Sequence, residues 1–243
     1  MKILVNGAAG HMGRILCGLI EKDAAFELAG RVDAFGEDTL KSLDDFEGQA
    51  DCLIDFSHHS QTEALTVWAV SHEVPLVVAT TGQTDEERAA IARAAERIPV
   101  FFSANMSPAI AMLAEMAKTA ARMFPEADIE LVEAHHHRKV DVPSGTALML
   151  ANSLKQARED AVLNIGRHEN GRRDPKEIGI HSLRMGNEVG MHEIIIATDT
   201  ETVTLKHQAH DRALFASGAL KAAKFLAGRP AGLYDMQALV NEG

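Results

Sequence analysis

The stretch KILVNGAAGHMG, residues 2–13, decides the fold. It begins with an apolar run typical of a buried strand and continues into a turn with glycine at positions 7, 10 and 13. Glycine permits a tight turn and lets backbone N–H groups approach a pyrophosphate, which the start of the following helix then stabilises. Because the spacing is GxxGxxG rather than GxGxxG, ordinary turn geometry is the alternative interpretation. The stretch predicts the first strand, turn and helix of a dinucleotide-binding domain.

The same alternation of strand and helix continues to residue 104. Four further apolar runs bounded by turn residues are typical of buried strands, at 26–32, 51–56, 75–80 and 99–103. Segments with helical spacing of apolar residues lie between them, at 13–22, 61–70 and 85–96. Strand–helix alternation predicts βαβ units and a parallel sheet. We therefore expect an α/β protein whose N-terminal part is a Rossmann domain.

The pattern changes after Asn105. An amphipathic helix at 109–123, a strand at 128–134 and a helix at 146–158 precede a long polar segment, 164–177, which we expect to be a loop. Three runs with the spacing of antiparallel strands follow, at 178–185, 191–198 and 201–208, and a strong helix at 212–228 comes after them. We expect an α+β second domain over residues 107–215, with residues 216–243 returning to the Rossmann domain of residues 1–106.

The bulk properties limit the partners and the compartment. A formal net charge of −11 over 243 residues disfavours nucleic acid and anionic membranes as partners. No window reaches the roughly 18 uncharged apolar residues that a membrane span needs, and the N-terminal apolar run is too short for a signal peptide. Cys17 and Cys52 lack the spacing of a disulfide framework or a zinc finger. We expect a cytoplasmic protein.

Asp33 ends the second expected strand, about 20 residues beyond the glycines. An acidic residue at this place binds the ribose hydroxyls of the adenosine and favours NADH over NADPH. Arg31 and His11 leave a 2′-phosphate open as an alternative, and Asp33 as an ordinary surface carboxylate is a second one.

Two other turns follow strands of the same expected sheet. Ligands bind at the carboxyl edge of a parallel sheet, so Thr80, Thr81 and Gly82 are expected near the nicotinamide. Polar turn residues without a ligand are the alternative. The second turn, residues 55–60, follows the strand at 51–56 and contains His58 and His59. We expect these two histidines to be surface residues rather than ligands.

The stretch EAHHHRKVDVPSG, residues 133–145, concentrates positive charge in an acidic chain. Three consecutive histidines in an extended segment point to alternating sides, so they do not share one tetrahedral metal ion. Arg138 and Lys139 repel a cation, and only Glu133 and Asp141 offer carboxylates nearby. We therefore expect no metal. A solvated basic loop is the plain alternative.

The favoured interpretation is an anion pocket with a proton donor. Lys139 supplies a point charge, and Pro143-Ser144-Gly145-Thr146 opens a helix whose N–H groups and dipole suit a carboxylate. Together they suit a small acid with two carboxylates. Histidine is the side chain best placed to donate a proton near neutral pH. With a nicotinamide cofactor, the chemistry becomes hydride transfer followed by protonation.

At this point the sequence resembles a known family, the dihydrodipicolinate reductases, also called 4-hydroxy-tetrahydrodipicolinate reductases. The segment Glu133–Ala147 is similar to the family signature E-A-H-H-x-x-K-x-D-x-P-S-G-T-A. The resemblance spans the chain and includes GAAGHMG (7–13), TTG (80–82), SANMS (103–107), RMGNEVGMHE (184–193) and GLYDM (232–236). It implies NAD(P)H-dependent reduction of 4-hydroxy-tetrahydrodipicolinate, by way of dihydrodipicolinate, in diaminopimelate and lysine biosynthesis. It also implies a Rossmann domain and a mixed-sheet substrate domain that builds a homotetramer. The two domains are expected to close over the substrate.

The resemblance also implies roles for individual residues. His135 is expected to be the general acid, and Lys139 to assist protonation and hold a carboxylate. The expected substrate-binding residues are His136, Lys139, Ser144, Gly145 and Thr146. The expected dinucleotide-binding residues of the glycine turn and the second strand are Gly7, Ala8, Ala9, Gly10, His11, Met12, Gly13 and Asp33. Those expected around the nicotinamide are Phe56, Ala79, Thr80, Thr81, Ser103, Ala104, Asn105 and Met106.

The sequence departs from the family pattern at three residues and in one segment, because the stretch between Asp33 and Asp51 is shorter than in many members. His11 stands where Arg or Lys is common, Ala79 replaces a usual Gly, and Met106 replaces an aromatic residue. These differences concern cofactor preference more than the type of reaction. A dinucleotide-binding regulator without catalysis and a metal-dependent hydrolase are the alternative functions. The intact Lys139 and Ser-Gly-Thr turn speak against the regulator.

Overall fold

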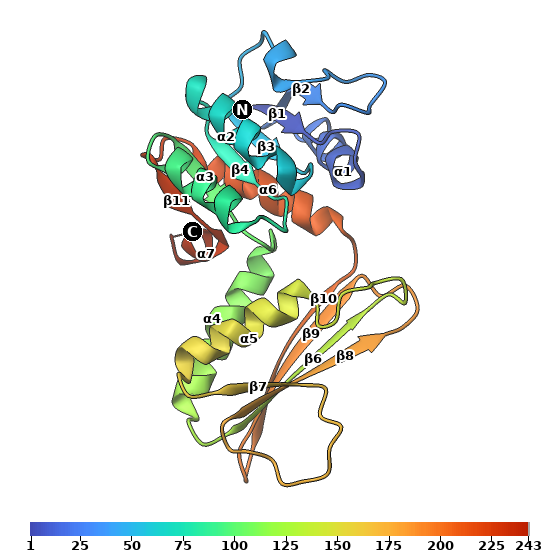
Figure 1. The fold of residues 1–243 in the computed structure, drawn as a ribbon, viewed down its shortest axis with the longest axis vertical. Helices are drawn as coiled ribbons and strands as arrows, with labels where there is room; N and C mark the ends of the chain where they lie inside the picture. The colour runs from blue at the N-terminus through green and yellow to red at the C-terminus, as the bar shows by residue number, and fades with distance from the viewer. Residues whose placement is uncertain (243) are drawn as a thin grey trace. The chain divides into compact units, whose positions relative to one another are not determined.

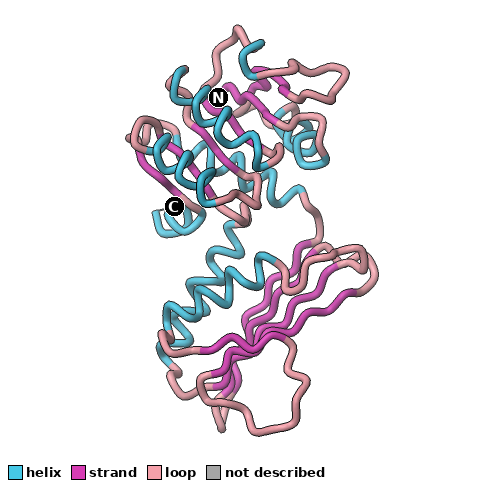
Figure 2. The backbone as a smooth tube through the Cα atoms, viewed as in Figure 1, coloured by secondary structure: helices cyan, strands magenta, loops and turns pink. Residues whose placement is uncertain are grey.

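The computed structural model describes residues 1–242 and divides the chain into two compact units. The first unit is Met1–Pro108 together with the C-terminal segment from Arg212, and the second is Ala109–Asp211. Within the described residues, no helix is both long enough and apolar enough to cross a membrane. Each unit has its own sheet (Figures 1 and 2).

The first unit contains a six-stranded sheet in which every pair of neighbouring strands is parallel. The strand order is β11-β5-β4-β3-β1-β2. The strands are β1 (Lys2–Asn6), β2 (Glu27–Val32), β3 (Cys52–Asp55), β4 (Leu76–Val78), β5 (Pro99–Phe102) and β11 (Gly232–Tyr234). The central strands β3 and β4 are buried along their whole length, as continuous apolar runs between two layers of helices require.

Helices cover the sheet of the first unit. They are α1 (His11–Ile20), α2 (Thr62–Ser71), α3 (Asp85–Ala95), α6 (Ala213–Leu226) and α7 (Met236–Glu242), with short 3₁₀ turns η1 (Leu43–Asp45) and η2 (His59–Gln61). Helix α1 packs against α6, and α2 packs against α3. Strand order runs outward from β1 in one direction and from β3 in the other, so right-handed crossovers place α1 and α2 on opposite faces. The order in which the chain adds strands therefore reverses between β1 and β3, which is where ligands bind in such folds.

The second unit contains a five-stranded mixed sheet in the order β10-β9-β6-β8-β7. Strands β6, β8 and β7 are parallel to one another, and β9 is antiparallel to both β6 and β10. The strands are β6 (Asp128–His135), β7 (Val162–Ile165), β8 (Glu177–Arg184), β9 (Gly190–Ala197) and β10 (Thr202–Ala209).

Two helices, α4 (Pro108–Met123) and α5 (Gly145–Ala157), supply the other half of the second core. Alternate residues of β6, β8 and β9 point toward them, including Ile129, Leu131, Ile178 and Ile194, all fully buried. Glu133 and His135 continue the same side of β6, because residues two apart share a face of a strand. The polar end of this strand therefore continues its buried apolar row.

The predicted α/β class, with a parallel Rossmann sheet and a mixed second sheet, is confirmed. The prediction of one loop over 164–177 was wrong at both ends, because β7 includes Asn164 and Ile165 and β8 begins at Glu177. Strand β11 and helix α7 were not predicted at all. Each of β7, β11 and α7 is only three to seven residues long and gains its order from pairing with a neighbour, which a local pattern does not reveal.

Candidate active site

The glycine turn lies between β1 and α1 and brings backbone groups into close contact. Gly7 has a φ of +77°, and a Cβ there would lie 2.5 Å from the carbonyl oxygen of Phe56. A Cβ on Gly13 would lie 2.1 Å from the carbonyl oxygen of Gly7. The first hydrogen bond inside α1 runs from the Arg14 amide to the Gly10 carbonyl, so the amides of the three preceding residues face the end of the helix. The turn fits a pyrophosphate, because its glycines allow these close backbone contacts and the first amides of α1 have no partner inside the helix.

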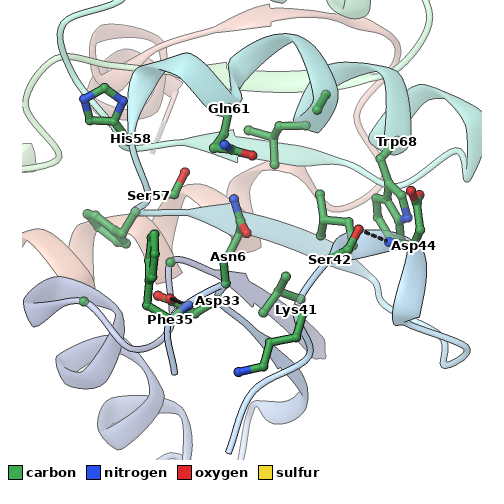
Figure 3. A pocket seen from close by; sticks show the side chains of 18 residues that line it. Asn6, Asp33, Phe35, Lys41, Ser42, Asp44, Ser57, His58, Gln61 and Trp68 are labelled. Carbon is green, nitrogen blue, oxygen red and sulfur yellow. Dashed lines mark hydrogen bonds between the residues drawn. The ribbon is translucent and has the colours of Figure 1, made fainter. Parts of the chain in front are cut away.

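Asp33 lies beside this turn at the end of β2. One of its carboxylate oxygens accepts a hydrogen bond from the Ala9 amide at 3.0 Å, and the other accepts one from the Phe35 amide at 2.9 Å. A cavity of about 400 Å³ opens next to Asp33, Gly7, Gly10 and Phe56. Figure 3 shows Asp33, Phe35 and Lys41 along one wall, and His58 and Gln61 opposite them. Turn, carboxylate and cavity together supply the amides, the hydrogen-bond acceptor and the space that an adenosine and its phosphates require.

The structure places the other predicted cofactor residues outside this cavity. Ala79, Thr80, Asn105 and Met106 are buried, and the Ser103 hydroxyl donates to the Asn105 carbonyl at 2.8 Å. Sequence reasoning missed several residues of the cavity, namely Asn6, Ala34, Phe35, Lys41, Ser57, Gln61 and Trp68. Most of them lie at or within a few residues of the predicted end of a strand. Closeness to a strand end is therefore the sequence signal that could have identified them. His58 is exposed, as expected of a surface residue, but it also lines the cavity.

Asp55, also missed, joins three turns of the first unit. It is 1% exposed, and its carboxylate accepts hydrogen bonds from Asn6 Nδ2 at 2.8 Å, Ser57 Oγ at 2.6 Å and Thr80 Oγ1 at 2.7 Å. These donors follow or end β1, β3 and β4. Burial raises the pKa of Asp55, although the hydrogen bonds from Ser57, Thr80 and Asn6 oppose that shift. The carboxyl group therefore fixes the carboxyl edge of the sheet beneath the glycine turn.

Replacing Asp55 with Ala is expected to weaken NADH binding about tenfold or more. The change leaves the donors on Asn6, Ser57 and Thr80 without their acceptor, and losing a hydrogen bond to a charged group costs roughly 1.5–3 kcal/mol. The single tryptophan, Trp68, lines the cavity, so its fluorescence during an NADH titration measures the dissociation constant. Asp51→Ala is the control, since Asp51 is exposed and bonds only to the Lys2 amide at the far end of β1. Equal affinities in the Asp55 variant and the wild type would contradict the role of Asp55.

The second unit holds a cluster around Glu133 and His135. Glu133 Oε2 lies 2.5 Å from His135 Nδ1, and Arg184 contacts both carboxylate oxygens at 2.9 and 3.0 Å. Burial by itself would raise the pKa of Glu133, but hydrogen bonds from His135, from Arg184 and from the Ser144 amide hold it well below its usual range. Glu133 therefore remains a charged acceptor inside the unit.

Ser144 links this cluster to the start of α5. It is the residue that precedes the first turn of the helix, and its hydroxyl accepts a hydrogen bond from the Ala147 amide at 3.2 Å. The same hydroxyl lies 3.1 Å from Nε2 of His192 on β9, while the Ser144 amide donates to Glu133 at 3.2 Å. Gly145, the first helical residue, has nothing within 4 Å of where a Cβ would lie. Glu133 and His192 thus hold the start of α5 in place, while the space beside Gly145 is open. A carboxylate site at a helix start requires both features.

Lys139 lies in the turn between β6 and α5. Its ammonium group is 2.8 Å from Asp141 Oδ1, and its side chain is 22% exposed. The turn is braced from a second loop, because the His137 ring contacts the Gly186 carbonyl at 2.8 Å and Arg138 donates to Asn187 at 2.9 Å. The predicted general acid, His135, is thus the last residue of β6, and the predicted substrate residues His136 and Lys139 follow it in the turn. No group of side chains in residues 1–242 has the composition of a metal site.

The buried His192 is expected to make stability depend on pH. Burial, followed by the nearby His135, lowers the pKa of His192 to about 4. The neutral ring is favoured in the folded state, so its contribution is complete above the unfolded pKa of about 6.5 and is lost as the pH falls toward 4. The lost free energy is about 3 kcal/mol.

Urea unfolding at pH 7 and at pH 4.5 measures this effect in the wild type and in His192→Gln. The difference in unfolding free energy between the two proteins is expected to shrink at low pH, because only the wild type has to protonate a buried ring. His168→Gln, at an exposed loop histidine, is the control and is expected to show no such change. A difference that stays constant with pH would contradict the assignment.

Comparison with known proteins finds the same family in the N-terminal and the C-terminal part of the chain. The models of the dihydrodipicolinate reductase N-terminus and C-terminus match residues 1–106 and 109–240. A 4-hydroxy-tetrahydrodipicolinate reductase from Caldanaerobacter subterraneus subsp. tengcongensis is 41% identical over 249 residues, covering 100% of this chain and 99% of the relative. One from Clostridium novyi is 37% identical over 246 residues, covering 98% of each chain.

Solved structures show the same fold. A dipicolinate-bound dihydrodipicolinate reductase from Paenisporosarcina sp. TG-14 superposes with a TM-score of 0.81 at 22% identity, covering 97% of each chain. A myo-inositol dehydrogenase from Corynebacterium glutamicum reaches a TM-score of 0.61 at 16% identity, covering 99% of this chain and 92% of the other. The fold and these relatives define an NAD(P)H-dependent oxidoreductase. Within that class, the chain belongs to the dihydrodipicolinate reductase family.

Proposed function

We propose that this chain reduces 4-hydroxy-tetrahydrodipicolinate, by way of dihydrodipicolinate, to tetrahydrodipicolinate in diaminopimelate and lysine biosynthesis. The observation that carries the proposal is the pairing of His135 with Glu133 beside the open start of α5, which puts a proton donor next to an anion site. Relatives of full length carry the name of this activity, and one solved relative is described as bound to dipicolinate, a small dicarboxylate.

Each unit supplies a part of the reaction. When bound, the nicotinamide supplies the hydride; the turn of residues 7–13 holds the phosphates and Asp33 holds the ribose. His135 donates the proton that completes the product. Lys139 holds one carboxylate of the substrate, and the Ser144–Thr146 turn with His136 holds the other. The amide and dipole at the start of α5 favour that negative charge.

We also propose that the enzyme prefers NADH. The carboxylate of Asp33 is fixed by two backbone amides beside the cavity, where it accepts hydrogen bonds from ribose hydroxyls and repels a 2′-phosphate. Arg31, the strand residue closest to Asp33 that would attract such a phosphate, is ion-paired with Glu21. Lys41, which lines the cavity, donates a hydrogen bond to the Gly36 carbonyl.

Parallel assays with freshly generated 4-hydroxy-tetrahydrodipicolinate test these proposals by the absorbance loss of NADH and of NADPH. Consumption that requires the substrate and is faster with NADH supports both. Faster consumption with NADPH overturns the cofactor preference alone. Absence of consumption with either cofactor, in protein that binds NADH by Trp68 fluorescence, favours the regulator or a different ring acid. Loss of activity on adding a chelator would favour a metal-dependent enzyme.

Lys139→Ala is expected to lower kcat/KM about 100-fold or more, the scale of a lost charge clamp. Because Lys139 both holds a carboxylate and assists protonation, we expect KM for the substrate to rise and kcat to fall. Steady-state kinetics at varied substrate and saturating NADH measure the two effects. Arg138→Ala, at the exposed neighbour that bonds to Asn187, is the matched control and is expected to stay within about threefold of the wild type. Near-normal turnover in the Lys139 variant would rule out its role.

The assembly and compartment are further parts of the proposal. We propose a homotetramer in the cytoplasm. Strand β10 lies at an edge of its sheet and pairs only with β9 among the described residues, so its other side is available to a second copy. Both cysteines are buried thiols, which suits a reducing compartment. Light scattering of the purified protein measures the assembly, and a monomer would overturn that part.

A further inference from the structure

Glu133 carries a full charge at a place that solvent does not reach. Its side chain is 0% exposed, yet the mechanism proposed above gives it no contact with substrate or cofactor. An isolated carboxylate in such a place is strongly unfavourable, so it persists only where partners compensate it. Glu133 has four such contacts, from His135 Nδ1, the two terminal nitrogens of Arg184 and the Ser144 amide.

The sheet explains why these partners meet. Glu133 and His135 are two residues apart on β6 and therefore share a face. Arg184 is the register partner of His135 on the parallel strand β8, so its side chain lies on the same face and reaches back to Glu133. Arg184 also donates to the carbonyls of Leu183 and Asp141 at 2.7 and 2.6 Å. The guanidinium group is thereby held as firmly as the carboxylate it contacts.

The arrangement leaves one nitrogen of His135 for chemistry. Nδ1 is taken by Glu133, and Nε2 points toward Gly190, where a Cβ would lie only 3.1 Å away. A residue with a side chain at position 190 would crowd this nitrogen, whereas glycine leaves room beside it. A buried carboxylate on one imidazole nitrogen fixes the tautomer and orientation of the ring and stabilises its charged form.

We propose that Glu133 is a positioning residue of the proposed reductase, which presents Nε2 of His135 as the proton-donating atom and joins it to the carboxylate site. The inference rests on the proposed function and adds the group that sets its proton donor. The junction runs through the Ser144 amide, because Glu133 holds the residue that starts α5 as well as the ring. One carboxylate thus keeps the donor and the substrate-binding turn at a fixed spacing.

Arg184 opposes Glu133 electrically. The charged or titratable groups around His135 include Glu133 on β6, Arg184 at the paired position of β8 and His192 on β9. Lys139, in the turn after β6, acts together with His135 on the pKa of His192. Glu133 favours the protonated ring, and the Arg184 charge weakens that effect. Removal of the carboxylate and removal of the guanidinium should therefore change the proton affinity of the donor in opposite directions. A purely structural role for either residue predicts no such opposition.

Two variants test the proposal in the NADH-dependent assay, Glu133→Gln and Arg184→Gln. In Glu133→Gln we expect kcat to fall about 100-fold or more, with the dissociation constant for NADH unchanged. A proton donor must be protonated to act, so activity declines on the alkaline side of the pH–rate profile. We expect this alkaline decline to occur at lower pH in Glu133→Gln and at higher pH in Arg184→Gln.

Glu130→Gln is the matched control. Glu130 lies on the same strand but on the opposite face, and it also has a histidine and an arginine partner, His181 at 2.8 Å and Arg173 at 3.1 Å. The control therefore removes the same charge from the same kind of cluster, and we expect kcat within about threefold of the wild type with an unchanged pH–rate profile.

The outcomes separate this inference from the function on which it rests. A wild type without substrate-dependent NADH consumption overturns both. An active wild type with equal turnover in Glu133→Gln overturns the role of Glu133 alone. If Glu133→Gln does not fold, as judged by circular dichroism, the profile of Arg184→Gln decides. A shift of its alkaline decline to higher pH supports the proposal, and an unshifted decline overturns it.

Discussion

Replacing His135 with Ala is expected to reduce kcat about 100-fold or more while the affinity for NADH stays unchanged. The ring is the group of the second unit best placed to give up a proton, because one nitrogen is held by Glu133 and the other lies beside the room left by Gly190. Positioned general acids contribute roughly 10²–10⁴-fold. NADH binding depends on the first unit, so it should not change. Steady-state absorbance assays of NADH consumption give kcat, and Trp68 fluorescence gives the affinity for NADH.

The three consecutive histidines supply their own control. His137 is exposed, lies two residues further along the chain and contacts the Gly186 carbonyl rather than Glu133. His137→Ala removes the same side chain from the same motif and is expected to remain within about threefold of the wild type. Equal losses in the two variants would show that the motif acts through loop structure. Near-normal turnover in the His135 variant would assign the proton to another group.

The sequence predicts the framework of the fold because most helices and strands have a local pattern of apolar and polar residues. Apolar runs separated by helical segments define β1 to β5, and alternation defines β8 to β10. The GxxGxxG turn marks where β1 passes into α1, and Asp33 marks the end of β2. These features depend on neighbours along the chain, which is why a single sequence reveals them.

The rest of the site depends on pairing across strands. Arg184 reaches Glu133 because β6 and β8 are parallel in one register, and His192 reaches Ser144 because β9 is antiparallel to β6. Nothing in the residues between 144 and 184 states that register. The motif at 184–193 resembles the family pattern, but its contact with Glu133 appears only in three dimensions.

Asp55 shows the same limit in the first unit. The sequence gives an acidic residue at the end of an apolar strand, which is also what an exposed turn would show. Its burial follows from strand order, since β3 lies between β1 and β4 and thus brings Asn6 and Thr80 to the same carboxylate. A polar residue at the end of a strand links neighbouring strands only when the strands on both sides supply hydrogen-bond donors.

Gly13→Ala is expected to weaken NADH binding by about 100-fold or more. A Cβ at this position would lie 2.1 Å from the Gly7 carbonyl oxygen and 2.7 Å from the Ala8 Cα. Both neighbours are backbone atoms, so the start of α1 has to move away from the turn. The movement misplaces the amides that face the phosphates, and several charge-assisted hydrogen bonds weaken together. Titration of NADH, followed by Trp68 fluorescence, measures the loss.

Gly18→Ala on the same helix separates this steric effect from the general effect of adding a methyl group. Gly18 has nothing within 4 Å of where its Cβ would lie, and it occupies the interior of α1. Alanine there should leave NADH affinity unchanged and raise the free energy of unfolding by roughly 0.5–1 kcal/mol, because glycine is the poorer helix former. The two substitutions are chemically identical and only five residues apart, so a loss of NADH affinity in the Gly13 variant alone would locate the dinucleotide site at the contact between Gly13 and Gly7. Tight NADH binding by the Gly13 variant would mean that the turn does not hold the phosphates.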